Sequence, residues 1–186
     1  MRLLGVMGSP RIKGNTDLLL DEAIKGAEKN GAYVEKIVAS KLTIAGCREC
    51  LSCYKEGNCV IQDDMQDIYS KLMEFERILV ASPIFFYGLP SQVKAIVDRC
   101  QALWARKHIL NQPPPLGRKG AFISIGATKG SRLFEGAKLT VEYFFEALSI
   151  DYVDELFVRE VDEKGKIKNH PTALNDAFEL GKQLVL

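Results

Sequence analysis

Residues 2–16 read RLLGVMGSPRIKGNT, an apolar run that ends in a turn rich in glycine and polar residues. The run at 2–7 is predicted to be a β-strand. After it, apolar residues recur with helical spacing at Leu18, Leu19, Ala23, Ile24 and Ala27. We expect Thr16 to cap this helix and Gly31 to end it. A strand that feeds a helix through a short turn is the repeating unit of parallel α/β sheets.

The same alternation continues along the chain and indicates the fold class. Further strands are predicted at residues 33–39, 77–82, 119–125 and 152–158, and further helices at 64–75, from Pro90 onward, at 133–148 and at 172–184. Five strands and five helices match an α/β fold with a doubly wound, five-stranded parallel sheet of the flavodoxin-like kind, strand order 2-1-3-4-5. In that order, the ligand crevice lies at the carboxyl ends of the first and third strands.

Composition limits the classes of partner. The 186 residues fit one domain, taken as 1–186, and Lys plus Arg (25) nearly balance Asp plus Glu (24). This balance gives no basic field for binding nucleic acid. No apolar run reaches the roughly 20 residues of a membrane span. A thiol-rich chain without a recognisable secretory signal indicates the cytoplasm.

The turn at residues 8–16 has the chemistry of a phosphate site. It lies between a strand and a helix N-terminus, where backbone N–H groups and the helix dipole favour an anion. Further donors come from the side chains of Ser9, Arg11, Asn15 and Thr16. The glycine spacing matches neither a Walker A loop nor a Gly-x-Gly-x-x-Gly dinucleotide turn, so an isolated phosphate is predicted. An ordinary strand-to-helix turn is the alternative.

Four of the five cysteines fall in one loop, expected at residues 43–64: Cys47, Cys50, Cys53 and Cys59. Two-residue gaps let consecutive thiolates converge on one metal centre, and a fourth nearby thiol suits an iron–sulfur cube. Structural zinc fits less well, because its Cys-x-x-Cys pairs are usually separated by a longer span. Reduced or redox-active thiols without a metal are the other alternative. Cys100, in an apolar helical pattern, is expected in the core.

Two motifs connect the chain with a known family. GSPRIKGNT at 8–16 follows the first strand, and SPIFFYGLPSQVKAIVDR at 82–99 follows the third. Together they resemble the NADPH-dependent FMN reductase branch of the flavodoxin-like superfamily. With the cysteine segment added, the chain is similar to the iron-sulfur flavoproteins of that branch, which carry FMN and a four-iron cluster on a compact cysteine loop.

The resemblance implies a set of site residues. The FMN phosphate would be held by Ser9, Arg11, Asn15 and Thr16. The flavin ring would lie against the third-strand loop, at Pro83, Ile84, Phe85, Phe86, Tyr87 and Gly88, and against the fourth-strand loop, at Gly126, Ala127 and Thr128. A [4Fe-4S] cluster would be held by Cys47, Cys50, Cys53 and Cys59. The family usually forms dimers or tetramers that complete the flavin pocket, so a homodimer or homotetramer is implied.

The remaining residues favour redox chemistry over hydrolysis. The chain has two histidines and no Ser/His/Asp set, so no side chain is assigned a catalytic role. We expect an FMN-dependent oxidoreductase that passes electrons from a reduced small-molecule or protein donor to an acceptor through flavin and cluster. The alternatives are an NAD(P)H-dependent FMN or quinone reductase without a cluster and a non-enzymatic electron carrier. The cysteine segment follows the second strand and is therefore expected at the same edge of the sheet as the flavin.

Overall fold

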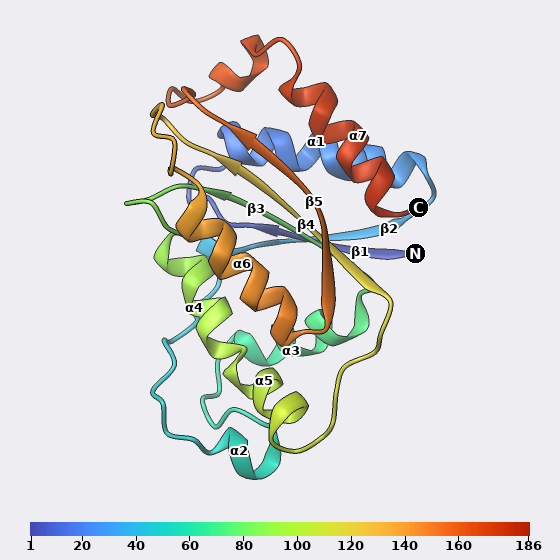
Figure 1. The fold of residues 1–186 in the computed structure, drawn as a ribbon, viewed down its shortest axis with the longest axis vertical. Coiled ribbons are helices and arrows are strands. Elements are labelled where there is room, and N and C mark those ends of the chain that lie inside the picture. Colours follow the sequence, from blue (N-terminus) through green and yellow to red (C-terminus); the bar gives the residue numbers. More distant parts are fainter.

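The computed structural model describes residues 1–186 and contains one sheet of five parallel strands. The strands are β1 (Arg2–Met7), β2 (Tyr33–Val38), β3 (Arg77–Pro83), β4 (Arg118–Ile125) and β5 (Ile150–Val158), in the order β2-β1-β3-β4-β5. The helices are α1 (Asn15–Lys29), α2 (Cys53–Glu56), α3 (Met65–Glu74), α4 (Ser91–Arg99), α5 (Gln101–His108), α6 (Glu135–Ala147) and α7 (Ala173–Leu184), with 3-10 turns η1 (Ala39–Lys41) and η2 (Lys166–Asn169). Helices cover both faces of the sheet, which confirms the predicted doubly wound fold (Figure 1).

The two faces of the sheet have separate hydrophobic layers. The helices α1 and α7 pack on one face, and α3, α4, α5 and α6 pack on the other. The helices α1 and α7 approach closely because two glycines meet at their contact: a Cβ on Gly26 would lie 2.0 Å from the carbonyl oxygen of Phe178, and one on Gly181 would lie 1.8 Å from that of Ala23. A larger residue at either position would force the two helices apart.

The strands were predicted well in the centre of the sheet and less well at its edge. The central strands β1, β3 and β4 are almost wholly buried, and for β3 and β4 this agrees with their continuous apolar character. The edge strand β5 begins at Ile150, two residues before the predicted start at 152. Its register shifts opposite Gly120 and Ala121, which leaves Val153 without a paired residue. Because the strand carries exposed acidic residues, its first residues do not show a hydrophobic strand pattern in the sequence.

One of the predicted helix features is wrong and two are confirmed. Thr16 does not cap α1, because the helix begins at Asn15 and Gly14 occupies the capping position. The predicted helix from Pro90 is α4, and it ends at Arg99; the N–H of Cys100 bonds to the carbonyls of both Ile96 and Val97 before the chain turns into the separate helix α5. The predicted end of α1 is confirmed: its last residue is Lys29, and Gly31 follows in the left-handed region at φ 79°.

Two buried arginines lie at the amino-terminal ends of β3 and β4 and bind carbonyl groups at helix ends. Arg77 donates to the carbonyl of Leu184 at the end of α7, at 2.7 Å from Nε to O. Arg118 donates to the carbonyls of Leu72 and Phe75, at and just beyond the end of α3, and to that of Leu148, which follows α6. These carbonyls lie where helices leave acceptors unpaired, so the arginines satisfy them. Burial lowers the pKa of Arg118 to about 10, and the guanidinium therefore stays charged at neutral pH.

We expect Arg118→Met to be among the most destabilising single changes outside the functional site. It would leave three buried carbonyls without a donor, at about 1–3 kcal/mol each. Relief from burying the charge offsets part of this cost, so we expect a net loss of roughly 3 kcal/mol in the free energy of unfolding, measured in urea. Arg132→Met is the matched control, because Arg132 is exposed and pairs only with Glu135. Equal urea midpoints for the two variants would contradict this role for Arg118.

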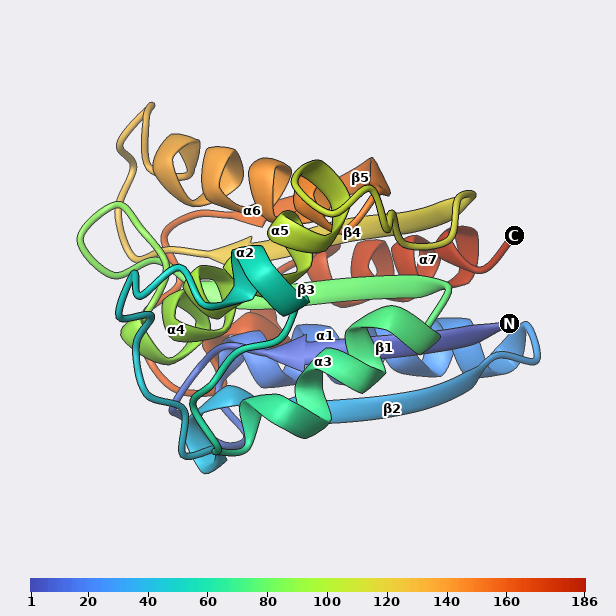
Figure 2. The same cartoon turned by 90° about the horizontal axis from the view of Figure 1, so that it is seen from below.

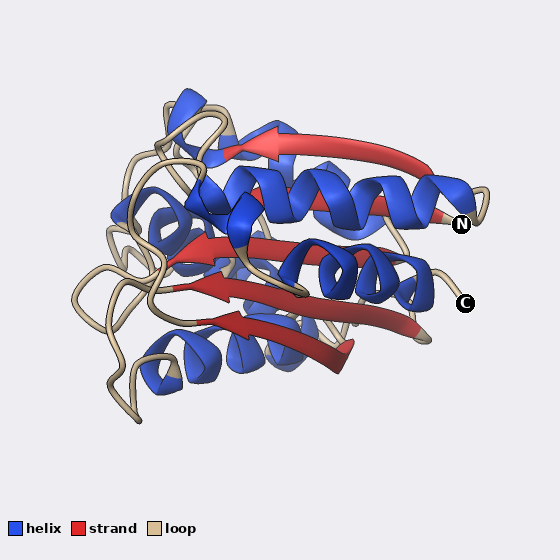
Figure 3. Cartoon of the chain, turned by 90° about the horizontal axis from the view of Figure 1, so that it is seen from above, coloured by secondary structure: helices blue, strands red, loops and turns tan.

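All five strands end on one side of the molecule, where the longer loops gather (Figure 3). We call this side, at the carboxyl ends of the strands, the rim. Most non-glycine residues with positive φ are in the loops that follow the strands there: Lys13, Glu49, Leu51, Phe86, Tyr87 and Glu160. Such backbone conformations are strained and concentrate at functional sites. Every helix is too short or too polar to span a lipid bilayer.

Candidate functional site

The loop between β1 and α1 presents free backbone donors. The N–H groups of Asn15, Thr16 and Asp17 open the first turn of α1 and donate to no group of the protein. The Asp17 carboxylate instead turns back to accept the N–H of Lys13 at 2.6 Å, and it pairs with Lys36. This arrangement shapes the turn and leaves unpaired donors at the positive end of the helix dipole, where an anion is favoured.

Two predicted phosphate ligands also tie this loop to the segment after β5. The Asn15 amide donates to the carbonyl of Glu163 at 2.8 Å and accepts the N–H of Ile167 at 3.2 Å. The Arg11 guanidinium donates to the carbonyl of Asp162 at 3.3 Å. The side chain of Asn15 is therefore engaged in holding the fold, whereas the hydroxyls of Ser9 and Thr16 keep a free proton to donate.

The loop after β3 forms a tight hairpin of aromatic residues. Phe85 and Gly88 exchange two backbone hydrogen bonds, each of 3.0 Å, around Phe86 and Tyr87. Both central residues have positive φ, at 49° and 62°, as in a type I′ turn. Such a turn is unfavourable for bulky side chains, and it leaves Phe86 fully exposed with Phe85 and Tyr87 half in solvent. Tyr87 reaches the neighbouring loop, since a Cβ on Gly130 would lie 2.7 Å from its hydroxyl.

These loops surround a cavity of about 90 Å³ at the carboxyl ends of β1, β3 and β4. Of the residues predicted to bind FMN, it is lined by Ser9, Arg11, Asn15, Thr16, Pro83, Ile84, Phe85, Gly126 and Ala127. Phe86, Tyr87, Gly88 and Thr128 lie outside its wall. Ile125, Val161 and Asp162 also line the cavity and were not predicted from the sequence. Asp162 and Val161 follow the last strand, and only the folding of that segment over α1 brings them to the site.

The four clustered cysteines border a second, smaller cavity, of about 30 Å³. Its other wall comes from the junction of α4 and α5, at Arg99, Gln101 and Ala102. No three Cys, His, Asp or Glu side chains of the chain are grouped closely enough to hold a metal ion. The thiols therefore share a cavity without being assembled around a centre.

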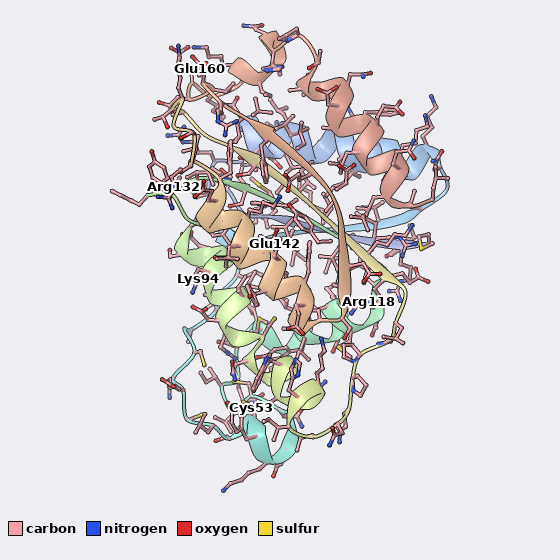
Figure 4. All side chains as sticks on the ribbon, in the orientation of Figure 1. Cys53, Lys94, Arg118, Arg132, Glu142 and Glu160 are labelled. Atoms are coloured by element: carbon pink, nitrogen blue, oxygen red, sulfur yellow. The ribbon has the colours of Figure 1, made fainter.

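The cysteine loop begins at the predicted edge of the sheet and then extends away from the rim cavity. It leaves the rim after β2 and runs along the helices, so that α2 packs against α5 (Figure 2). Cys53 lies near one end of the molecule, whereas Glu160, in the loop after β5, lies near the other (Figure 4). The two cavities share no residue. The cysteine loop thus starts at the predicted edge of the sheet, whereas its α2 segment lies beside α5, where Tyr54 packs on Trp104.

The backbone around Cys50 is unusual. Glu49 and Leu51, on either side of it, both have positive φ, at 51° and 57°. Hydrogen bonds from the side chain and backbone of Ser52 lower the pKa of the exposed Cys50 thiol. Burial raises the pKa of Cys53 and, more strongly, that of Cys100, which lies in the core as predicted. The exposed Cys50 thiol therefore ionises more readily than an ordinary cysteine.

Several known proteins resemble this chain. An iron-sulfur flavoprotein of Methanocaldococcus jannaschii is 33% identical over 129 residues, which are 69% of this chain and 64% of that protein. An iron-sulfur flavoprotein of Methanosarcina thermophila is 31% identical over 129 residues, 69% of this chain and 65% of its own length. The matched part therefore spans slightly less than two thirds of these relatives.

Solved structures share the fold at low sequence identity. An FMN-dependent NADH-azoreductase from Bacillus anthracis, in complex with FMN, superposes over 100% of both chains with a TM-score of 0.69 and 13% identity. A flavone reductase superposes with a TM-score of 0.70 and 19% identity, over 100% of this chain and 62% of its own. The sequence model of one family, NADPH-dependent FMN reductase, matches residues 1–151. The chain belongs to the NADPH-dependent FMN reductase family.

Proposed function

We propose that this chain binds FMN at the rim cavity and passes electrons from a reduced donor to an acceptor. The observation that carries the proposal is the composition of that cavity. It combines free N–H groups at the start of α1 with an apolar wall from Pro83, Ile84 and Phe85. A phosphate needs the first feature and a flavin ring needs the second. The family match favours the same cofactor.

The cavity suits the phosphate end of FMN. Its volume of about 90 Å³ is below the roughly 300–1,000 Å³ of pockets that enclose whole ligands. The N–H groups of Asn15 and Thr16 would bind the phosphate, with the hydroxyls of Ser9 and Thr16 and the guanidinium of Arg11. The ring would extend over the rim, against Phe85 and the loop at 126–128.

Bound FMN would supply the redox chemistry, because a flavin accepts two electrons as a hydride and can release them singly. The residues of the chain would orient the ring and keep water from one side. The aromatic turn at Phe86 and Tyr87 offers flat apolar surface for this purpose. We propose one FMN-binding domain over 1–186 that works in the cytoplasm as a homodimer or homotetramer, in which a second copy would cover the exposed Phe86.

We further propose a [4Fe-4S] cluster on Cys47, Cys50, Cys53 and Cys59. The donor set fits in kind and number, since four soft thiols from one loop border one cavity. The strained backbone at Glu49 and Leu51 fits a loop that is shaped for ligation. The thiols would have to close around the metal, as in sites where metal binding and local folding are coupled. The relatives named iron-sulfur flavoproteins support this proposal.

A flavin reductase without a cluster is the second candidate, and the family match supports it equally. Protein purified and reconstituted without oxygen separates the two. We expect bound FMN, iron and labile sulfide in the same sample, with cluster absorption beneath the flavin bands. FMN without iron or sulfide would leave the plain flavin reductase as the function.

Stopped-flow mixing of the FMN-loaded protein with NADH or NADPH tests the reductase against the electron carrier. For a reductase we expect bleaching of the flavin within seconds, because the nicotinamide can reach the open rim beside Phe85. Turnover with an artificial acceptor should then be steady. Reduction by a protein donor such as a ferredoxin, with no reaction with either nicotinamide, would assign the chain as a carrier.

A further inference from the structure

Arg99, the last residue of α4, is a fully buried cation on the wall of the cysteine cavity. Its side chain has 0% exposure, and it is the largest fully buried side chain in the molecule. Burying a guanidinium is costly unless charge and hydrogen-bond partners compensate it. The partners of Arg99 therefore indicate what the position is for.

The terminal nitrogens of Arg99 make four hydrogen bonds, two to backbone carbonyls of the cysteine loop and two to the carboxylate of Asp63. One terminal nitrogen donates to the carbonyl of Ala45 at 2.9 Å and to the Asp63 carboxylate at 2.6 Å. The other donates to the carbonyl of Ile61 at 3.2 Å and to Asp63 at 3.1 Å. Ala45 precedes the first clustered cysteine and Ile61 follows the last, so Arg99 fastens both ends of the loop.

The fifth donor of this guanidinium is unsatisfied. Arg99 Nε is the one buried side-chain nitrogen or oxygen in the chain without a hydrogen-bond partner. A buried donor left unpaired costs about 1–3 kcal/mol, and native structures contain few of them. Every other fully buried side-chain nitrogen or oxygen atom has a partner, including those of Arg77 and Arg118. The orphan donor belongs to a residue that lines the cavity shared by the four thiols.

We propose that Arg99 positions and tunes the sulfur ligands of the cysteine loop, its Nε–H donating a hydrogen bond to a sulfur and its charge offsetting that of the thiolates. This inference rests on the cluster proposed above. One-electron reduction adds a negative charge to a cluster, and a buried cation with a hydrogen bond to sulfur stabilises the reduced form. Arg99 therefore raises the reduction potential, and Asp63, on its other side, lowers it.

The test measures the midpoint potential of the cluster in FMN-loaded, anaerobically reconstituted protein, followed by the EPR signal of the reduced cluster. Arg99→Gln should favour the oxidised form at least tenfold, which is about 59 mV toward lower potential for one electron. Asp63→Asn should shift the potential in the opposite direction, because it leaves the arginine charge uncompensated. Arg99→Lys keeps the charge and should stay nearer to the wild type than Arg99→Gln does.

Arg106→Gln is the matched control for loop anchoring. Arg106 also fastens the cysteine loop, with its Nε donating to the carbonyl of Gly57 at 2.7 Å, but it is half-buried and does not line the cavity. It should lower cluster retention without changing the potential. The FMN potential is an internal control, because Arg99 takes no part in the rim cavity, and it should remain constant in all variants.

The possible outcomes distinguish a failure of the proposed role of Arg99 from a failure of the proposed cluster. Opposite shifts for Arg99→Gln and Asp63→Asn establish the tuning role, since loss of structure alone would not produce both signs. If Arg99→Gln does not fold, Asp63→Asn and Arg99→Lys decide the matter. If the wild-type protein holds a cluster but Arg99→Gln and Asp63→Asn leave its midpoint potential unchanged, the inference about Arg99 is overturned and the cluster stands. The same holds if Arg106→Gln shifts the potential as much as Arg99→Gln does. Wild-type protein without iron or labile sulfide overturns the cluster and this inference with it.

Discussion

Cys50→Ser is expected to abolish iron binding and to leave FMN in place. Cys50 is exposed, its pKa is lowered by hydrogen bonds from Ser52, and it lies between the two left-handed residues Glu49 and Leu51. A serine hydroxyl is a poor replacement for a thiolate at iron. The rim cavity contains no residue of the cysteine loop, so the phosphate site should be unaffected.

Iron and labile sulfide, assayed per FMN in anaerobically reconstituted protein, provide the measurement. Cys100→Ala is the matched control, because Cys100 is buried in the core and has a strongly raised pKa. That variant should keep its iron at a small cost in stability. Full iron content in Cys50→Ser, or free alkylation of all four clustered thiols in reconstituted wild-type protein, would contradict the cluster.

The Ser9→Ala/Thr16→Ala double variant is expected to bind FMN at least a hundredfold more weakly, with little change in stability. Both hydroxyls lie in the cavity next to the free N–H groups of α1. Hydrogen bonds to a charged group contribute about 1.5–3 kcal/mol each, so the loss of two gives roughly 3 kcal/mol or more, which corresponds to this factor. Quenching of flavin fluorescence on titration measures the affinity.

Asn15 has to be treated separately in this experiment. Its amide holds the carbonyl of Glu163 and the N–H of Ile167, so Asn15→Ala should reduce the free energy of unfolding as well as FMN affinity. Thr140→Ala is the control for the double variant, since its hydroxyl bonds only to the carbonyl of Gly136 within α6. An affinity for FMN in Ser9→Ala/Thr16→Ala equal to that of the control would place the phosphate elsewhere.

The fold could be predicted from the sequence because its signals are local. Continuous apolar runs define β3 and β4. Gly31 follows α1 in a left-handed conformation, which glycine adopts more readily than other residues, so the end of this helix could be predicted. Loops that follow parallel strands lie at the same edge of the sheet, so their position could be predicted once the strands were known. The residues on either side of Gly14 and those after Ser82 could therefore be assigned to one cavity. Sequence patterns thus determined the sheet, its order and most of the cavity wall.

Only the tertiary structure decided where the cysteine loop lies and which distant residues serve each site. Asp162 reaches the rim cavity through contacts of the last segment with Arg11 and Asn15, more than 140 residues earlier in the chain. Arg99 reads as an ordinary residue at the end of a helix, yet the bend at Cys100 buries it between both ends of the cysteine loop. Such pairings depend on contacts between segments that carry no local signal, because side-chain burial and partner geometry are fixed only when the layers pack.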